Sequence, residues 1–205
     1  GGDQDETVIA LPETTTAFIG VVDDDETLQS AALIVLDPSG VGGAVVPFEA
    51  AADISAGRAD SVMPLRDALD AEDSTFFALD AESLTGLTFD VVEIVTASEL
   101  ADLLGGAGAV SLKLPPSVVS GAGVQWLQGR SSVSIEEATE LLAIGGDAPA
   151  EFGARLHAAV WNGIVNQLSG SADTQLTDGG VPPRSADEVI AALFAGDVET
   201  RSLHL

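Results

Sequence analysis

The sequence contains no cysteine and little positive charge. Without cysteine the chain has no disulfide framework, zinc finger or thiol nucleophile. Lys113 is the single lysine, and seven Lys and Arg residues stand against 33 Asp and Glu, which gives a formal net charge of −26. Because affinity for phosphate backbones depends on Lys and Arg, this composition excludes nucleic-acid binding and disfavours anionic membrane surfaces.

Long hydrophobic runs are also absent. Residues 31–36 form one of the longest, far below the ~20 residues that span a bilayer, and the start Gly1-Gly2-Asp3 lacks the features of a signal peptide. The sequence nevertheless has 46% hydrophobic residues in 205, and a chain of this size buries roughly 70% of its unfolded surface. We expect one folded domain with an acidic surface.

The order of apolar segments predicts the fold class. Runs at 16–22, 31–36 and 43–46 are separated by turn residues, which favours consecutive antiparallel strands. Two pieces with helical spacing follow within 59–85, and then strand 89–95, a short helix capped by Ser98, and strand 110–114. A capping box, Ser134 with Glu137, opens a helix to 144. We therefore predict an α/β (mixed α+β) domain with a central mixed sheet flanked by helices.

Composition divides the chain into four parts. Residues 1–14 are polar and unpatterned, and we expect them to be disordered or left over from cloning. Residues 15–169 form the α/β domain, whose longest helix carries an apolar stripe from Phe152 to Leu168. Residues 170–184 have the composition of a linker. Residues 185–205 begin with a second capping-box pattern, Ser185 with Glu188, and predict a short helix and strand appended to the domain.

The sequence lacks most of the motifs that mark nucleotide-binding, catalytic and metal-binding sites. There is no G-x-G-x-x-G loop, Walker A lysine or G-x-S-x-G elbow, and His157 and His204 lie too far apart for H-E-x-x-H. The acidic run 23–26 lacks EF-hand spacing, which favours a solvated turn over a cation site. Core packing is the preferred interpretation of His157, Trp126 and Trp161, with pocket lining as the alternative for the two tryptophans.

Several short segments occur in an order typical of one family. The segments are Val21-Val22-Asp23, residues 27–31, Asp37-Pro38, residues 45–49, residues 84–95, residues 103–106, residues 133–143 and residues 151–159. From about Phe18 to Leu168 the sequence resembles the LytR-CpsA-Psr (LCP) extracytoplasmic domain, and we expect an LCP-like fold.

The resemblance implies a site as well as a fold. The family moves a glycopolymer from a polyprenyl-diphosphate carrier to the cell wall, with acidic residues holding Mg²⁺ and arginines gripping phosphate. The positions that match those arginines hold Thr27, Phe48, Ala143, Ala154 and His157, so the fixed charges are gone. Arg155 lies one residue off the pattern. The resemblance implies a residual pocket or site formed by Asp23, Gln29, Phe48, Glu49, Ala154, Arg155 and His157, with Asp23 and Glu49 as the candidate metal ligands.

These departures predict a catalytically degenerate LCP-like cell-envelope domain with no catalytic residues. It would bind a polyprenyl-linked or other apolar ligand, or act as a scaffold in glycopolymer assembly. We expect no cofactor, with Mg²⁺ needed only if phosphotransferase activity survives. Expected partners are a polyprenyl phosphate lipid, a cell-wall glycopolymer or an envelope protein. The family also implies an extracytoplasmic location, with a membrane anchor that precedes this sequence in the full-length protein.

Two alternatives remain open. The first is an active phosphotransferase that grips phosphate with arginines from other elements, namely Arg58, Arg66, Arg130 or Arg155. The second is a protein–protein interaction module whose segment 185–205 packs against a partner.

Overall fold

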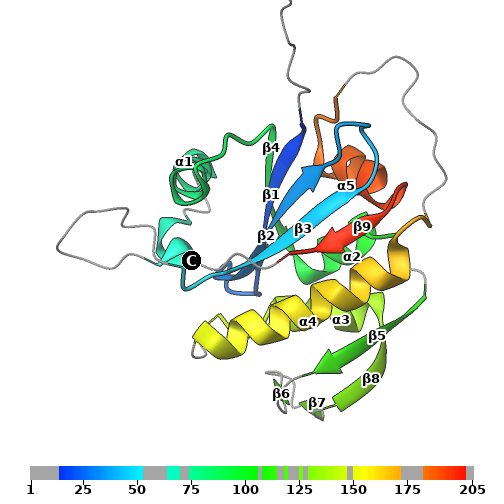
Figure 1. Cartoon of the computed structure of the whole chain (residues 1–205). Helices are drawn as coiled ribbons and strands as arrows, with labels where there is room; N and C mark the ends of the chain where they lie inside the picture. The colour runs from blue at the N-terminus through cyan, green and yellow to red at the C-terminus, as the bar shows by residue number, and fades with distance from the viewer. Residues whose placement is uncertain are drawn as a thin grey trace, which may run out of the picture.

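The computed structural model describes residues 14–52, 64–69, 74–105, 108–114, 118–119, 125–126, 129–146, 150–171 and 182–201. A five-stranded sheet forms the centre of the described structure (Figure 1). Its strands are β1 (Thr16–Val22), β2 (Leu28–Leu36), β3 (Gly43–Glu49), β4 (Val91–Thr96) and β9 (Val198–Thr200), in the order β4-β1-β2-β3-β9. β1, β2 and β3 pair antiparallel, whereas β4 runs parallel to β1 and β9 parallel to β3. The prediction of a mixed central sheet is confirmed.

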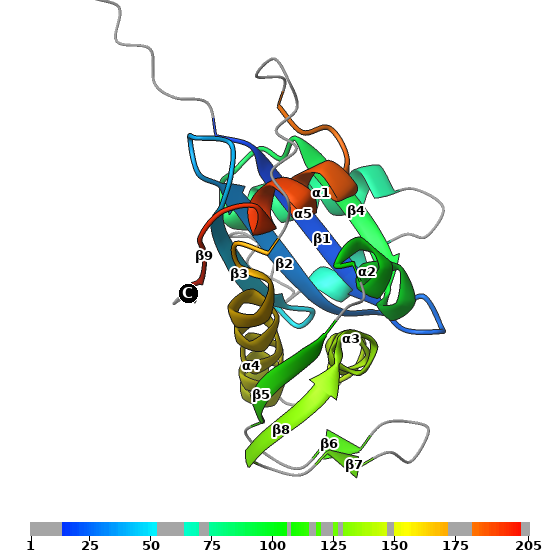
Figure 2. The same ribbon diagram turned by 90° about the vertical axis from the view of Figure 1, so that its right-hand side faces the viewer.

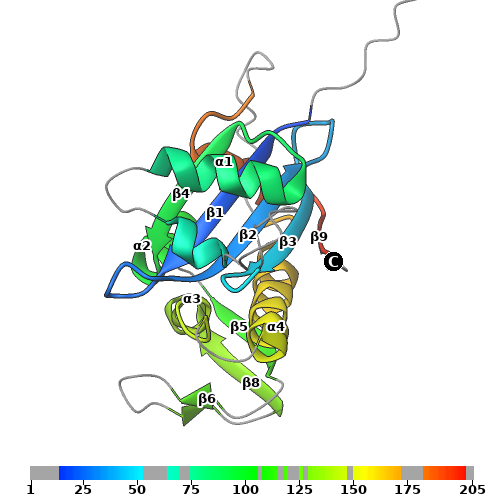
Figure 3. The same cartoon turned by 90° about the vertical axis from the view of Figure 1, so that its left-hand side faces the viewer.

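Helices cover both faces of this sheet. The short 3-10 helix η1 (Leu65–Ala68) and α1 (Ser74–Thr85) lie on one face (Figure 3). The other face is covered by α2 (Ala97–Leu103), α3 (Ile135–Leu142), α4 (Ala150–Leu168) and α5 (Ala186–Phe194) (Figure 2). None of the helices in the described ranges is long and apolar enough to cross a membrane.

A second, smaller layer lies beyond α3 and α4. β5 (Ala109–Leu114) pairs antiparallel with β8 (Gly129–Ser134), and β6 (Val118–Val119) pairs with β7 (Gln125–Trp126). The buried face of β5 packs directly on α4 at Gly163. A Cβ there would stand 2.9 Å from Cγ1 of Val110 and 3.1 Å from the Ser111 carbonyl. The missing side chain therefore sets how closely helix and strand approach.

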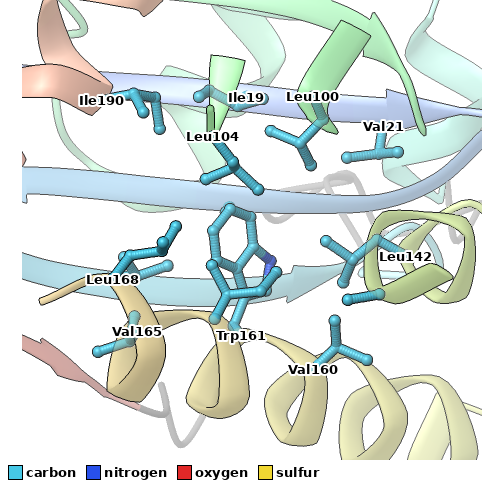
Figure 4. Close-up of a cluster of buried hydrophobic side chains, with 14 of the residues drawn as sticks. Ile19, Val21, Leu100, Leu104, Leu142, Val160, Trp161, Val165, Leu168 and Ile190 are labelled. Carbon is cyan, nitrogen blue, oxygen red and sulfur yellow. The ribbon is translucent and has the colours of Figure 1, made fainter. Parts of the chain in front are cut away.

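The larger core lies between the sheet and helices α2 to α5 (Figure 4). Trp161 of α4 stands at its centre, fully buried, among side chains that include Leu104, Leu142 and Ile190. The indole Nε1 has no hydrogen-bond partner, so burial of the ring outweighs the cost of one unsatisfied donor. The preferred interpretation of Trp161 as a packing residue agrees with this position. The side chain of Trp126 lies outside the described residues.

The smaller core lies under α1 and contains an aromatic cluster. The ring of Phe18 stands 5.7 Å from that of Phe48, 5.7 Å from that of Phe77 and 5.1 Å from that of Phe89, measured between centroids. Tilted rings at these distances add about 0.5–1.5 kcal/mol per pair to the burial of their surface.

Helix ends follow the sequence closely, with two corrections. Ser134 and Glu137 form the predicted capping box at α3. At α5 only half of the predicted box forms: Ser185 accepts a hydrogen bond from the Glu188 amide, while the Glu188 carboxylate accepts from the Arg184 amide. The cap of α2 is Thr96 rather than Ser98. Thr96 forms a capping box with Glu99, and Ser98 falls inside the helix. Glu99 reaches the Thr96 amide from the third helical position, whereas no acid stands three residues after Ser98.

The segment before α1 differs from the helix expected there. Within 64–69 the chain forms only the 3-10 turn η1. The amides of Leu65 and Arg66 donate to the carbonyls of Ala52 and Ala50, at 2.8 and 2.9 Å. The turn ends at Leu69, whose backbone is extended (φ −73°, ψ 116°), so the helical conformation does not continue beyond Ala68.

The C-terminal segment is built into the domain. β9 extends the central sheet at β3, and α5 buries Val189, Ile190, Leu193 and Phe194 in the larger core. Residues 172–181 of the predicted linker and residues 1–13 lie outside the described residues.

Candidate functional site

The acidic run after β1 forms a tight turn. The Asp23 amide donates to the Thr27 carbonyl at 3.1 Å, and Oδ1 of Asp23 accepts hydrogen bonds from the amides of Asp25 at 3.0 Å and Thr27 at 2.9 Å. Asp24, Asp25 and Glu26 are exposed. This geometry agrees with the preferred interpretation of residues 23–26 as a solvated turn.

Gln29 joins this turn to the chain between α3 and α4. Its Nε2 donates to Oδ2 of Asp23 at 2.7 Å, and its Oε1 accepts from the Gly146 amide at 2.9 Å. Only 5% of Gln29 is exposed. The next residue, Ser30, donates from Oγ to the Leu142 carbonyl at 2.7 Å. Two adjacent residues of β2 therefore hold residues 142–146 against the sheet.

His157 of α4 holds the same segment from the other side. Its Nε2 lies 2.8 Å from the Ile144 carbonyl, so Nε2 carries the proton and donates. Nδ1 is buried without a hydrogen-bond partner. Burial lowers the pKa of His157 below 6.5, and the bond to Ile144 offsets this only in part. At neutral pH the imidazole is uncharged.

A narrow cleft lies where these elements meet. It is lined by Gln29, Glu49, Ala50, Ala51, Gly145, Gly146, Gly153 and His157, and it leaves no room for a water molecule. Burial raises the pKa of Glu49 above 4.5. The cleft therefore combines a neutral imidazole with a partly desolvated carboxyl group.

Three of the residues expected at the residual site line this cleft together, namely Gln29, Glu49 and His157. Asp23 reaches it through Gln29. Ala154 is half-buried and does not line the cleft; the preceding residue, Gly153, lines it instead. Arg155 is 69% exposed and pairs with Glu151 at 3.4 Å.

Phe48 does not join the others. Its ring packs against Phe18 in the smaller core and is 4% exposed, while the next residue, Glu49, lines the cleft. Successive side chains of a strand point to opposite faces, so both cannot face the cleft. An arginine introduced at position 48 would place its charge in the aromatic cluster.

Sequence reasoning missed the glycines of the cleft. A Cβ on Gly146 would stand 2.9 Å from Cα of Gln29, and Gly145 has φ of 96°. Two consecutive glycines after a helix are an ordinary stop signal, so nothing local marks them as partners of Gln29.

Among the proposed alternative arginines, Arg66 alone contacts the cleft within the described residues. Its Nη1 donates to the Gly146 carbonyl at 2.6 Å. Arg130 is exposed on β8, and Arg58 lies outside the described ranges.

The donor set does not fit Mg²⁺. In the described part of the chain no three His, Asp or Glu residues gather where they could hold a metal ion. Both carboxylate oxygens of Asp23 accept hydrogen bonds, one from the Gln29 amide group and the other from the backbone of its own turn. Among the described residues, Glu49 is the one carboxylate that lines the cleft. Mg²⁺ binds through charged oxygens in octahedral geometry, and the described residues of the cleft do not provide such a set.

Comparisons with known proteins identify the fold. No family model and no curated protein sequence matches the chain. Among solved structures, B. subtilis TagV is 12% identical with a TM-score of 0.63 and covers 95% of this chain and 86% of its own. Protein gbs0355 from Streptococcus agalactiae is 12% identical with a TM-score of 0.64, and the match covers 94% of this chain and 77% of the gbs0355 chain.

A third structure, described as TagT bound to LIIa-WTA, is 14% identical with a TM-score of 0.59 and covers 93% of this chain and 79% of its own. TagV and TagT are LCP-family enzymes. Identities this low establish shared architecture and no more. The chain therefore has an LCP-like fold, as its sequence motifs predict.

Proposed function

We propose that this chain is a non-catalytic, LCP-like domain of the cell envelope, acting as a scaffold or binding module in glycopolymer assembly. The observation that carries the proposal is the cleft between β2, β3 and α4. Its titratable residues are a neutral His157 and Glu49, and it has no room for water. A diphosphate needs space and several cations, and the described residues of this lining offer neither.

The likeness to TagT supplies the cell-envelope part of the proposal, because TagT is bound to LIIa-WTA in its structure. By the same analogy we place the domain on the outer side of the cytoplasmic membrane, with an anchor in the full-length protein.

The direct test is an assay with a polyprenyl-diphosphate-linked glycopolymer, Mg²⁺ and an acceptor wall fragment. We expect no transfer by the purified chain. Organic extraction followed by mass spectrometry would show whether a long apolar lipid copurifies. Bound lipid without transfer supports a binding module. The absence of both bound lipid and transfer supports a scaffold. Transfer above background would overturn the proposal.

An active enzyme with a rearranged site is the second candidate, and the contact between Arg66 and Gly146 favours it. Here Arg66→Ala would abolish transfer. Arg201→Ala is the matched control, because Arg201 is exposed, pairs with Glu199 and is not one of the candidate phosphate-binding arginines. Equal activity of both variants would exclude this candidate.

A further inference from the structure

A groove runs along β4 at the edge of the central sheet. It has a volume of about 420 Å³, within the range of sites that hold a ligand. β4, α2 and the start of α5 line it, with the residues Glu93, Ile94, Val95, Glu99, Asp102, Leu103, Ser185, Ala186 and Asp187. It lies away from the cleft at Gln29 and His157, with which it shares no residue.

β4 is the last strand of the sheet in the described residues. β1 pairs with it on one side, and no described strand pairs with it on the other (Figure 2). An edge strand presents unpaired amide and carbonyl groups, which form a ready template for a further strand. Residues of α2 and of the start of α5 line the groove together with β4, so an added strand would be flanked by side chains as well as by the backbone of β4.

The rim of the groove carries charge of one sign. Glu93, Glu99, Asp102 and Asp187 are all exposed, and within the described residues none forms an ion pair with a cation. Glu99 is engaged by Thr96, whose hydrogen bonds lower the pKa of this carboxyl group. Ile94, Leu103 and Ala186 contribute apolar surface. The surface therefore complements a chain with both cationic and apolar side chains.

We propose that this groove binds a basic, extended segment of another protein, which pairs with β4 as an additional strand. The charge of this chain argues against other occupants. Outside the described residues its only cationic residue, apart from any charge on His204, is Arg58, so its own segments do not complement four acids. A second copy would bring another net charge of −26. The proposal does not depend on whether the domain transfers glycopolymer.

The first experiment separates strand pairing from attraction of charge. The probe is a fluorescein-labelled decapeptide of alternating Lys and Val. The control peptide keeps the same lysines and has Pro in place of each Val. Proline cannot donate a ladder hydrogen bond. In fluorescence anisotropy at 150 mM NaCl we expect the Lys–Val peptide to bind at least tenfold more tightly. Equal affinities, or no binding by either peptide, would overturn the proposal.

The second experiment places the site. Glu93→Lys with Asp187→Lys changes the net charge by four, and Asp24→Lys with Asp25→Lys makes the same change on the exposed turn after β1. We expect the groove variant to lose at least tenfold in affinity for the Lys–Val peptide and the turn variant less than threefold. Equal losses of affinity would show that general charge attraction drives binding and would refute the groove as the binding site. Glu93→Gln with Asp187→Asn repeats the test with neutral, isosteric side chains, and circular dichroism confirms that each variant is folded.

Discussion

Gln29 and Asp23 are joined by a hydrogen bond of 2.7 Å between Nε2 and Oδ2, while the other end of the Gln29 amide accepts from the Gly146 backbone. An amide is the side chain that can donate to a carboxylate and accept from a peptide group at once. A carboxylate at position 29 could accept from Gly146 but would repel Asp23. This pair thus forms a structural bridge between the first turn and the chain before α4.

Replacing Gln29 with Asp tests this bridge. We expect Gln29→Asp to lower the free energy of unfolding at pH 7 by about 3 kcal/mol, since it leaves buried hydrogen-bonding groups unpaired and adds a like charge beside Asp23. Millimolar Mg²⁺ should restore part of this loss by binding between the two carboxylates. Urea unfolding with and without Mg²⁺ provides the measurement.

Gln29→Ala is the control for Gln29→Asp, because it removes the same hydrogen bonds without adding charge. Mg²⁺ also screens the acidic surface, so each shift is compared with that of Gln29→Ala at equal ionic strength. A Mg²⁺-dependent shift in the natural protein that exceeds the control would contradict our conclusion that its donor set does not fit the metal.

The buried imidazole of His157 predicts a pH dependence of stability. Its pKa is lowered by burial in the folded protein, whereas the unfolded side chain titrates near 6.5. Below pH 6.5 the unfolded chain therefore binds a proton that the folded chain does not, and stability falls as pH falls. The slope from one proton is at most about 1.4 kcal/mol per pH unit. His157→Gln should remove this contribution in urea titrations between pH 5 and 7, and superimposable profiles would refute it.

Glu49 changes the stability of the folded protein with pH in the opposite direction to His157. Its pKa is raised by burial, so its ionised form weakens the folded state at pH 7, and this cost disappears as pH falls through the folded value. We expect Glu49→Gln to melt at a higher temperature than the natural protein at pH 7, with the difference shrinking toward pH 4. Melting curves of both proteins across this range test the sign. A variant that is less stable at pH 7 would indicate that Glu49 has a favourable partner.

The contact between α4 and β5 depends on the missing side chain of Gly163. A Cβ at this position would crowd Val110 and the Ser111 carbonyl, and overpacking costs about 1–3 kcal/mol. We expect Gly163→Val to lower the free energy of unfolding by about 2 kcal/mol and Gly163→Ala by less, because alanine regains helix propensity. Asn166→Ala, on the exposed side of the same helix, should change stability by under about 0.5 kcal/mol. Equal stability of Gly163→Val and the natural protein would contradict the close packing.

Salt should stabilise the whole domain. With a net charge of −26, like charges repel in the compact state, and ions screen this repulsion over distances beyond about 8 Å at 0.15 M. We expect the melting temperature to rise between 10 mM and 1 M NaCl. A flat profile would mean that the acidic residues are spaced widely enough for repulsion to be negligible.

The sequence by itself determined the features that depend on near neighbours. Apolar runs broken by turns predicted β1 to β3, the capping box at Ser134 predicted the start of α3, and the net charge predicted an acidic surface. Spacings of three or four residues decide caps and helix stripes, and these are visible in a single chain. The LCP-like fold was predicted by the resemblance of the motif order to that family, not by local spacing.

Only the tertiary structure decided which faces and segments meet. β1 and β2 are buried on both faces, so alternation along these strands carries no signal for the side of the sheet. On β3 the family resemblance implies one pocket for Phe48 and Glu49, but adjacent side chains of a strand point to opposite faces. Residues 145–146 meet Gln29 across more than a hundred residues, and β9 joins β3 across an even longer separation. Such contacts depend on the shape of the packed core, which no local pattern in the sequence encodes.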